Sequence, residues 1–130
     1  MISRDLWTSA GVGEFRIEEE SAGSATTVLA VYGDADLHSA PELWERLSAA
    51  IGDGATLLVV DLSETTVVDS TSLGVLLRAM KRIREDGGRL VLVVPRPELR
   101  RVFEITMLDR ILPLHETHEE AFAASSNGAG

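Results

Sequence analysis

The chain has no cysteine among its 130 residues, which excludes disulfides, thiolate catalysis and cysteine-ligated metals. It also has no apolar run approaching the ~20 residues that a membrane helix needs. The N-terminus lacks the basic start and apolar core of a secretory signal. Because a chain without cysteine suits a reducing compartment, we expect a cytoplasmic location.

Positive charge is scarce as well. Lysine and arginine number 12 against 21 acidic residues, which gives a net charge of −9. An acidic surface repels phosphodiester backbones and anionic lipids, so we expect neither nucleic acid nor a membrane as a partner. No phosphate loop, nucleophile elbow or clustered metal-ligand set occurs, so no cofactor, metal or enzyme activity is expected. His115 and His118 flank a predicted helix cap and are expected to be solvated.

The apolar pattern predicts a single α/β domain at residues 14–124, between a flexible arm (residues 1–13) and a disordered tail (residues 125–130). Strands are predicted at residues 15–19, 27–32, 56–62, 90–94 and 111–114, with helices starting near residues 39, 70, 97 and 117. The runs at 56–62 and 90–94 are nearly all apolar, which is typical of strands buried on both faces of a parallel sheet. A hairpin at 21–24 adds an antiparallel edge. We therefore expect a mixed, mostly parallel sheet of about four to five strands with about four helices.

Two of these helices carry capping-box sequences. Ser39 stands three residues before Glu42, and Thr117 three residues before Glu120. In such a box the hydroxyl accepts an N–H of the first helical turn. Ser39 and Thr117 are therefore predicted to cap their helices.

Residues 67–77 are the most informative segment. A short apolar strand end runs into Asp69 and Ser70, and a helical apolar pattern begins at once. A hydroxyl at a helix N-terminus sits where free N–H groups and the helix dipole favour added negative charge. The loops after Gly33 and Val68 are expected to emerge at the same sheet end and to form one surface. The plainer alternative is that Asp69 and Ser70 only cap the helix.

At this point the sequence resembles the STAS domain (sulfate transporter and anti-sigma-factor antagonist), in particular the free-standing bacterial anti-sigma-factor antagonists. Three segments carry the resemblance, which covers nearly the whole chain. Residues 33–40 resemble the family's acidic loop after the second strand. Residues 61–63 and 68–74 resemble its phosphorylation loop, and residues 101–109 resemble its third helix.

The resemblance implies a regulatory switch. Ser70 sits at the family's phosphoacceptor serine, and Asp69 and Asp36 sit at its two loop acids. The implied partners are an anti-sigma-factor serine kinase, whose binding frees the sigma factor, and a serine phosphatase that resets the cycle. The chain is expected to be a monomer when free. The partner-binding residues are then expected to be Asp34, Asp36, Asp69, Thr71 and Ser72.

Two other readings remain open. Ser72 stands where the family often has glycine, so a side chain there is expected to affect access to the serine. In this second reading the chain is a STAS docking module of a lipid-transport or sensory complex, and the chain itself is not phosphorylated. An enzyme or nucleotide-binding protein is the third reading, although the loops offer no base–nucleophile pair.

Overall fold

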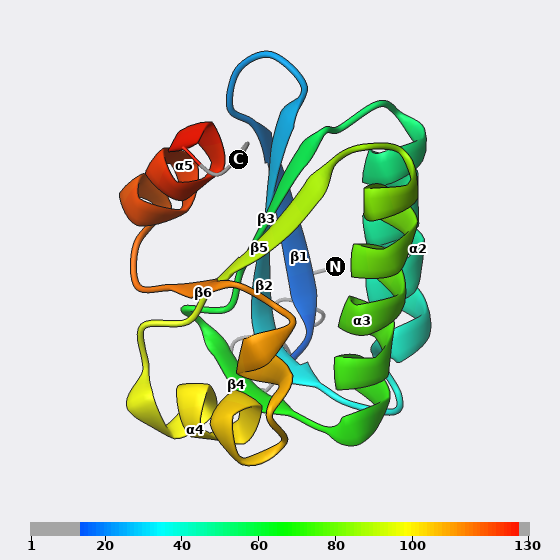
Figure 1. Cartoon of the computed structure of the whole chain (residues 1–130). Helices are drawn as coiled ribbons and strands as arrows, with labels where there is room; N and C mark the ends of the chain where they lie inside the picture. Colours follow the sequence, from blue (N-terminus) through cyan, green and yellow to red (C-terminus); the bar gives the residue numbers. More distant parts are fainter. Residues whose placement is uncertain (1–13, 128–130) are drawn as a thin grey trace, which may run out of the picture.

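The computed structural model describes residues 14–127 (Figure 1). The predicted arm, residues 1–13, and residues 128–130 of the predicted tail lie outside the described residues. In chain order the elements are β1 (Arg16–Ser21), β2 (Thr26–Ala35), α2 (Ala40–Gly52), β3 (Leu57–Asp61), β4 (Thr65–Val68), α3 (Ser70–Glu85), β5 (Arg89–Val93), α4 (Pro97–Ile105), the 3₁₀ helix η1 (Leu108–Arg110), β6 (Leu114–His115) and α5 (His118–Asn127).

One mixed sheet organises the fold. Its strand order is β1-β2-β3-β5-β6, and β4 pairs with β2 off this path. The β1–β2 hairpin is antiparallel, whereas all the other pairings are parallel. This confirms the predicted mixed, mostly parallel sheet, with six strands among the described residues rather than four to five.

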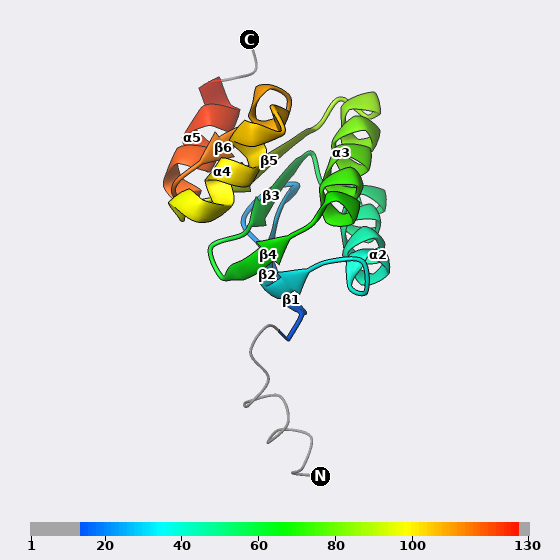
Figure 2. The same ribbon diagram turned by 90° about the horizontal axis from the view of Figure 1, so that it is seen from below.

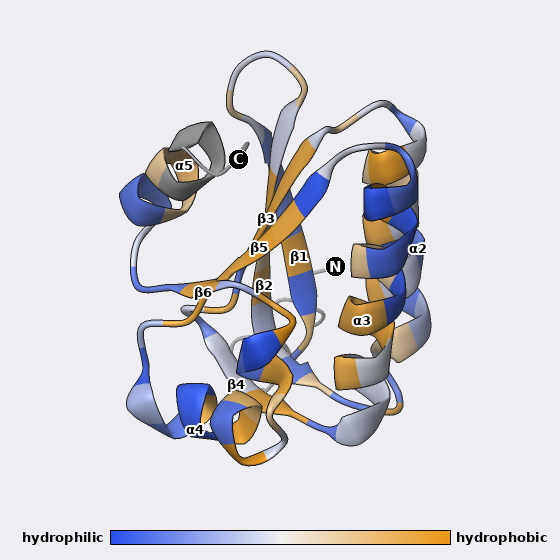
Figure 3. Ribbon diagram, viewed as in Figure 1, coloured by the Kyte–Doolittle hydropathy of each residue, from blue (hydrophilic) through white to orange (hydrophobic). Residues whose placement is uncertain are grey.

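Helices cover both faces of the sheet. Helices α2 and α3 lie on one face and α5 lies on the other (Figure 1). Leu58 of β3 and its neighbour Leu90 of β5 belong to the larger core, beneath α2 and α3. Val59 and Val91, one residue further on, belong to the smaller core that includes α5. Because alternate side chains enter two different cores, both strands are apolar except at one end, Asp61 in β3 and Arg89 in β5, and Figure 3 shows both strands mostly orange.

Strand β2 changes its partner at a bend. Gly33 was expected to end this strand, but β2 continues to Ala35. Gly33 has φ of 88°, a left-handed value that glycine adopts without steric cost. The register shifts between Gly33 and Asp34, so that the first part of β2 pairs with β3 and the last part with β4. The bend thus directs the end of β2 away from the main sheet.

The C-terminal part departs from the sequence prediction in two places. The strand expected at 111–114 is the two-residue β6, and a 3₁₀ turn precedes it. Helix α5 extends to Asn127, into residues assigned to the tail, and it packs on β5 through a buried Ala121. Among the described residues, no helix combines the length and apolar character needed to cross a membrane.

Candidate functional site

The candidate site lies at the end of the sheet where β2 and β4 finish. Figure 2 shows this end, with β4, the start of α3 and the loop before α2 together. The Asp69 N–H donates to the carbonyl oxygen of Ala35 at 3.1 Å. The Leu37 N–H donates to Asp69 Oδ2 at 2.9 Å. The two loops are therefore joined, as expected from the sequence.

Asp69 holds both loops with one carboxylate. It is the N-cap of α3 in an extended conformation, and its Oδ1 accepts the Ser72 N–H at 3.0 Å. Its Oδ2 accepts the Leu37 N–H from the other loop. The capping role proposed as the plainer alternative is thus real. It coexists with a second role, since the same side chain fixes the position of residues 36–39.

Ser70 and Thr71 are the first two residues of α3, and both are exposed. No hydrogen bond holds the Ser70 hydroxyl within residues 14–127. The N–H groups of a first helical turn have no acceptor inside the helix, and the helix dipole is positive there. A phosphate on Ser70 Oγ would therefore meet a local environment that favours negative charge.

Ser72 has a different environment from its neighbours. Its side chain is fully buried, with 0% exposure, and its Oγ lies 3.5 Å from the carbonyl oxygen of Asp36. The side chain that replaces the family's usual glycine therefore points into the protein. It does not crowd the surface beside Ser70. In this conformation Ser72 offers no side-chain atoms to a partner, so it is not part of the proposed contact surface.

At the start of α2 the free N–H groups are held by Asp36 and not by the Ser39 hydroxyl. Asp36 Oδ1 accepts the N–H groups of His38 and Ser39, at 2.9 and 3.2 Å. The Ser39 hydroxyl makes no cap bond, and Ser39 has helical dihedral angles instead of the extended ones of a typical capping residue. It donates to the carbonyl oxygen of Asp34 at 2.9 Å. Ser39 therefore occupies the predicted N-cap position of α2, but the prediction that its hydroxyl caps the helix is wrong. The same prediction for Thr117 is confirmed, since its hydroxyl accepts the Glu120 N–H at 3.0 Å.

Asp34 faces β4 more than it faces Ser70. Its carboxylate accepts a hydrogen bond from the hydroxyl of Thr66. Asp34 and Asp36 also line a hollow that includes Phe15, His38 and Glu42 but neither Asp69 nor Ser70. The structure therefore joins Asp36 and Asp69 through the loop backbone. Asp34 lies at the edge of this arrangement.

A second hollow lies on the face of the sheet that α5 covers, apart from the candidate site. It is lined by residues of β1, β2, β3 and α5, among them Glu18, Tyr32, Asp61 and His118. His118 Nε2 lies 2.6 Å from Asp61 Oδ2. The expectation that His118 is simply solvated is therefore wrong. The two residues are 57 positions apart, and the periodicity of the sequence gives no signal for such a contact.

Comparisons with known proteins agree with this geometry. The sequence model of the STAS domain matches residues 17–121. The anti-sigma-B factor antagonist of Listeria monocytogenes is 36% identical over 90 residues, which span 69% of this chain and 79% of that protein. Relatives with such names are regulators.

Solved structures give the same result. The anti-sigma factor antagonist of Mycobacterium paratuberculosis has a TM-score of 0.78 and 28% identity, covering 86% of this chain and 94% of that one. The antagonist SpoIIAA in its unphosphorylated form has a TM-score of 0.72 and 27% identity, covering 87% and 97%. The phosphorylated form from Bacillus has a TM-score of 0.65 and 27% identity, covering 85% and 99%.

Proposed function

We propose that this chain, which belongs to the STAS domain family, is an anti-sigma factor antagonist controlled by phosphorylation of Ser70. In its unmodified form it binds an anti-sigma factor that is also a serine kinase, in the cytoplasm, and so releases the sigma factor. The kinase then phosphorylates Ser70, and the complex dissociates. A serine phosphatase restores the active form.

The observation that carries this proposal is the setting of Ser70. Its hydroxyl is exposed at the first position of α3, directly after the cap residue Asp69. A kinase can reach such a hydroxyl without unfolding the helix. The relatives support the proposal, because they are named antagonists of anti-sigma factors and one of them is known in unphosphorylated and phosphorylated forms.

The chemistry of the transfer assigns the base to the partner. Ser70 Oγ attacks the γ-phosphorus of ATP held by the kinase, ADP leaves, and the hydroxyl proton passes to an acceptor. Both oxygens of Asp69 already accept N–H groups, those of Ser72 and Leu37. Asp69 therefore has a structural role in holding the loops, and we assign the role of proton acceptor to a residue of the kinase.

Mass spectrometry after incubation with the partner kinase and ATP tests this proposal. The kinase is first recovered by a pull-down from the native cytosol and identified by its ATP-dependent activity. We expect one phosphate, mapped to Ser70, and none on Ser70→Ala, while Ser70→Ala still binds the kinase. Ser63→Ala, a nearby serine after β3, serves as the matched control and should be phosphorylated normally.

The alternative function, a docking module that is not phosphorylated, predicts a different result in this experiment. A docking module of a transport or sensory complex would bind its partner with no phosphate added under any condition. Phosphate found only at Thr71 or elsewhere would contradict the assignment of Ser70, even if the chain is a kinase substrate.

A further inference from the structure

Large apolar side chains that remain exposed collect at one end of the molecule. Among the described residues they are Leu37 (63% exposed), Val67 (47%), Ile105 (69%), Met107 (53%) and Ile111 (43%). The first two belong to the joined loops and β4 of the candidate site. The other three flank the end of α4 and η1, and we call them the α4 patch. Single exposed apolar residues are ordinary, whereas a gathered set is informative.

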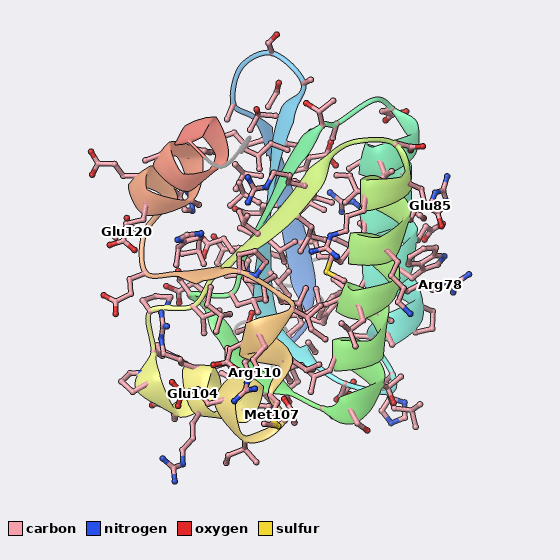
Figure 4. All side chains as sticks on the ribbon, viewed as in Figure 1. Arg78, Glu85, Glu104, Met107, Arg110 and Glu120 are labelled. Atoms are coloured by element: carbon pink, nitrogen blue, oxygen red, sulfur yellow. The ribbon has the colours of Figure 1, made fainter. Side chains whose placement is uncertain are left out.

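The α4 patch is next to the Ser70 end of the molecule. Helix α4 packs against β4, the strand that leads into Asp69 and Ser70. Arg96, just before α4, donates from Nη2 to the carbonyl oxygen of Thr65 in β4 at 2.6 Å. Figures 1 and 2 both place α4 at the same end as β4 and the start of α3. Figure 4 shows Met107 there, close to Glu104 and Arg110.

Met107 has an unfavourable left-handed backbone conformation, and its side chain is not packed in the core. Its φ of 63° and ψ of 16° lie in the left-handed region, which costs a residue with a Cβ more than it costs glycine. A bulky residue held there would be understandable if its side chain filled the core, yet about half of it is exposed. Glycine would serve the turn better, so the folded monomer alone does not account for the methionine.

We propose that the α4 patch is the apolar part of the surface on which the anti-sigma-factor kinase docks, beside Ser70. This inference rests on the function proposed above and adds a second contact region to it. Interfaces commonly place apolar anchors within a polar rim, and here the joined loops with Asp36 and Asp69 supply the polar side. The apolar contact provides affinity that does not depend on the state of Ser70.

Charge argues for a different protein, and against a second copy of this chain, as the occupant. The chain carries a net charge of −9, and the patch adjoins its acidic loops. The residues around the α4 patch itself carry both signs, as Glu104 and Arg110 do. Two copies meeting on this end would bring together their acidic loops with Asp36 and Asp69, and such juxtaposition disfavours association. A partner with apolar groups and a less acidic rim fits the same surface without that repulsion.

Substituting Met107→Gly separates the docking role from a structural one. The change removes the exposed side chain and relieves the left-handed backbone, so the unfolding midpoint should stay the same or rise. Affinity for the unmodified protein, measured by calorimetry with the ADP-bound kinase, should fall by about tenfold, as for truncation of an interface anchor. Ile105→Ser, at an exposed position of α4, should have a comparable effect on affinity with little effect on the midpoint.

The matched control is Ala25→Gly, which relieves the other non-glycine left-handed residue, with φ of 55°. Ala25 is exposed in the β1–β2 turn, at the opposite end of the molecule in Figure 1. The affinity of the Ala25→Gly variant for the kinase should equal that of the wild type.

Each outcome decides something. Wild-type affinity in both Met107→Gly and Ile105→Ser, with normal phosphorylation of Ser70, would overturn the patch and leave the proposed function intact. Failure of the wild type to bind any kinase would remove the proposed function and the patch with it. Sedimentation that finds a wild-type dimer abolished by Met107→Gly, at unchanged kinase affinity, would assign the patch to a second copy and overturn our proposal.

Discussion

Asp69 is the side chain on which the geometry of the site depends most. Its two carboxylate oxygens accept N–H groups from different loops, that of Ser72 within α3 and that of Leu37 before α2. Removing the Asp69 carboxylate therefore removes the α3 cap and the contact between the two loops at the same time. A single acid thus links helix capping, which is a matter of stability, to the shape of the surface around Ser70.

We expect Asp69→Ala to lower the free energy of unfolding by about 2 kcal/mol, the range for a lost cap with a second N–H left unpaired. Asp69→Asn keeps one acceptor oxygen and should lose about half as much. Urea unfolding of the three proteins measures this. Equal stability of Asp69→Ala and the wild type would mean that water replaces both contacts at no cost.

Asp36 offers a cleaner test of surface charge. Its Oδ1 holds the turn by accepting the N–H groups of His38 and Ser39, and an asparagine side-chain oxygen can accept the same bonds. Asp36→Asn should therefore change stability by no more than about 0.5 kcal/mol, yet weaken kinase binding or slow phosphorylation of Ser70. Unfolding midpoint, affinity and rate are to be measured on the same preparation. Affinity and rate both at wild-type values would remove Asp36 from the contact surface.

Residue type alone predicts some of these contacts and misses others. The capping positions of Asp69 and Thr117 follow from a polar side chain just before an apolar helical pattern. Ser39 has the same local signature, but its hydroxyl turns back to the carbonyl oxygen of Asp34, where the bent end of β2 brings an acceptor within reach. The inward orientation of Ser72 likewise depends on the neighbouring loop, which comes from residues more than thirty positions away.

The bend in β2 positions the acidic loop. Gly33 has φ of 88° and precedes the register shift that carries Asp34 and Ala35 toward β4. We expect Gly33→Ala to cost about 1–2 kcal/mol, because a Cβ is disfavoured in that conformation. Kinase affinity should fall as well, since the residues that follow Gly33 carry Asp36 and Leu37. Ala30→Gly, in the unbent part of β2, controls for the general effect of a glycine change. Unchanged unfolding and affinity in Gly33→Ala would show that the bend does not require glycine.

Some strands of this fold can be predicted from the sequence better than others. The apolar runs of β3 and β5 are unambiguous because both faces of these strands are buried. For β4 the sequence indicates only an apolar strand end before Asp69, so the predicted order does not include this strand. It has four residues, of which Thr65 and Val68 are buried and the two between them are exposed, so it has neither alternation nor a continuous apolar run. It pairs only with the last residues of β2, around the register shift after Gly33, and a pairing between segments about thirty positions apart leaves no local pattern.

The molecule as a whole places its acidic loops and its exposed apolar residues at the same end. The Ser70 motif could be found in the sequence because its residues are contiguous. The α4 patch could not, since Met107 follows a predicted amphipathic helix and Ile111 begins a predicted strand, and both positions suggest burial. The structure shows Ile105, Met107 and Ile111 exposed. A partner that uses this end meets both features at once, and a modification at Ser70 changes the charge of the shared surface.

We expect phosphorylation of Ser70 to keep the fold and abolish most of the binding. Phosphate adds a charge of about −1.5 to −2 at pH 7. The N-terminus of α3 stabilises that charge by roughly 0.3–1 kcal/mol while it is solvated. In a docked complex it would be desolvated beside the Asp69 carboxylate. Each ~1.4 kcal/mol of that cost lowers affinity tenfold, so we expect a loss of at least ~100-fold.

Calorimetry of the phosphorylated and unmodified proteins against the kinase measures this loss, with circular dichroism as the check on the fold. Ser70→Asp should reproduce it only in part, because aspartate brings less charge and fewer acceptor oxygens than phosphate. Met107→Gly provides the contrast, since it should weaken binding of the unmodified protein without introducing charge. If the phosphorylated and unmodified proteins bind with equal affinity, phosphate does not gate docking, and the site at Ser70 is not a switch.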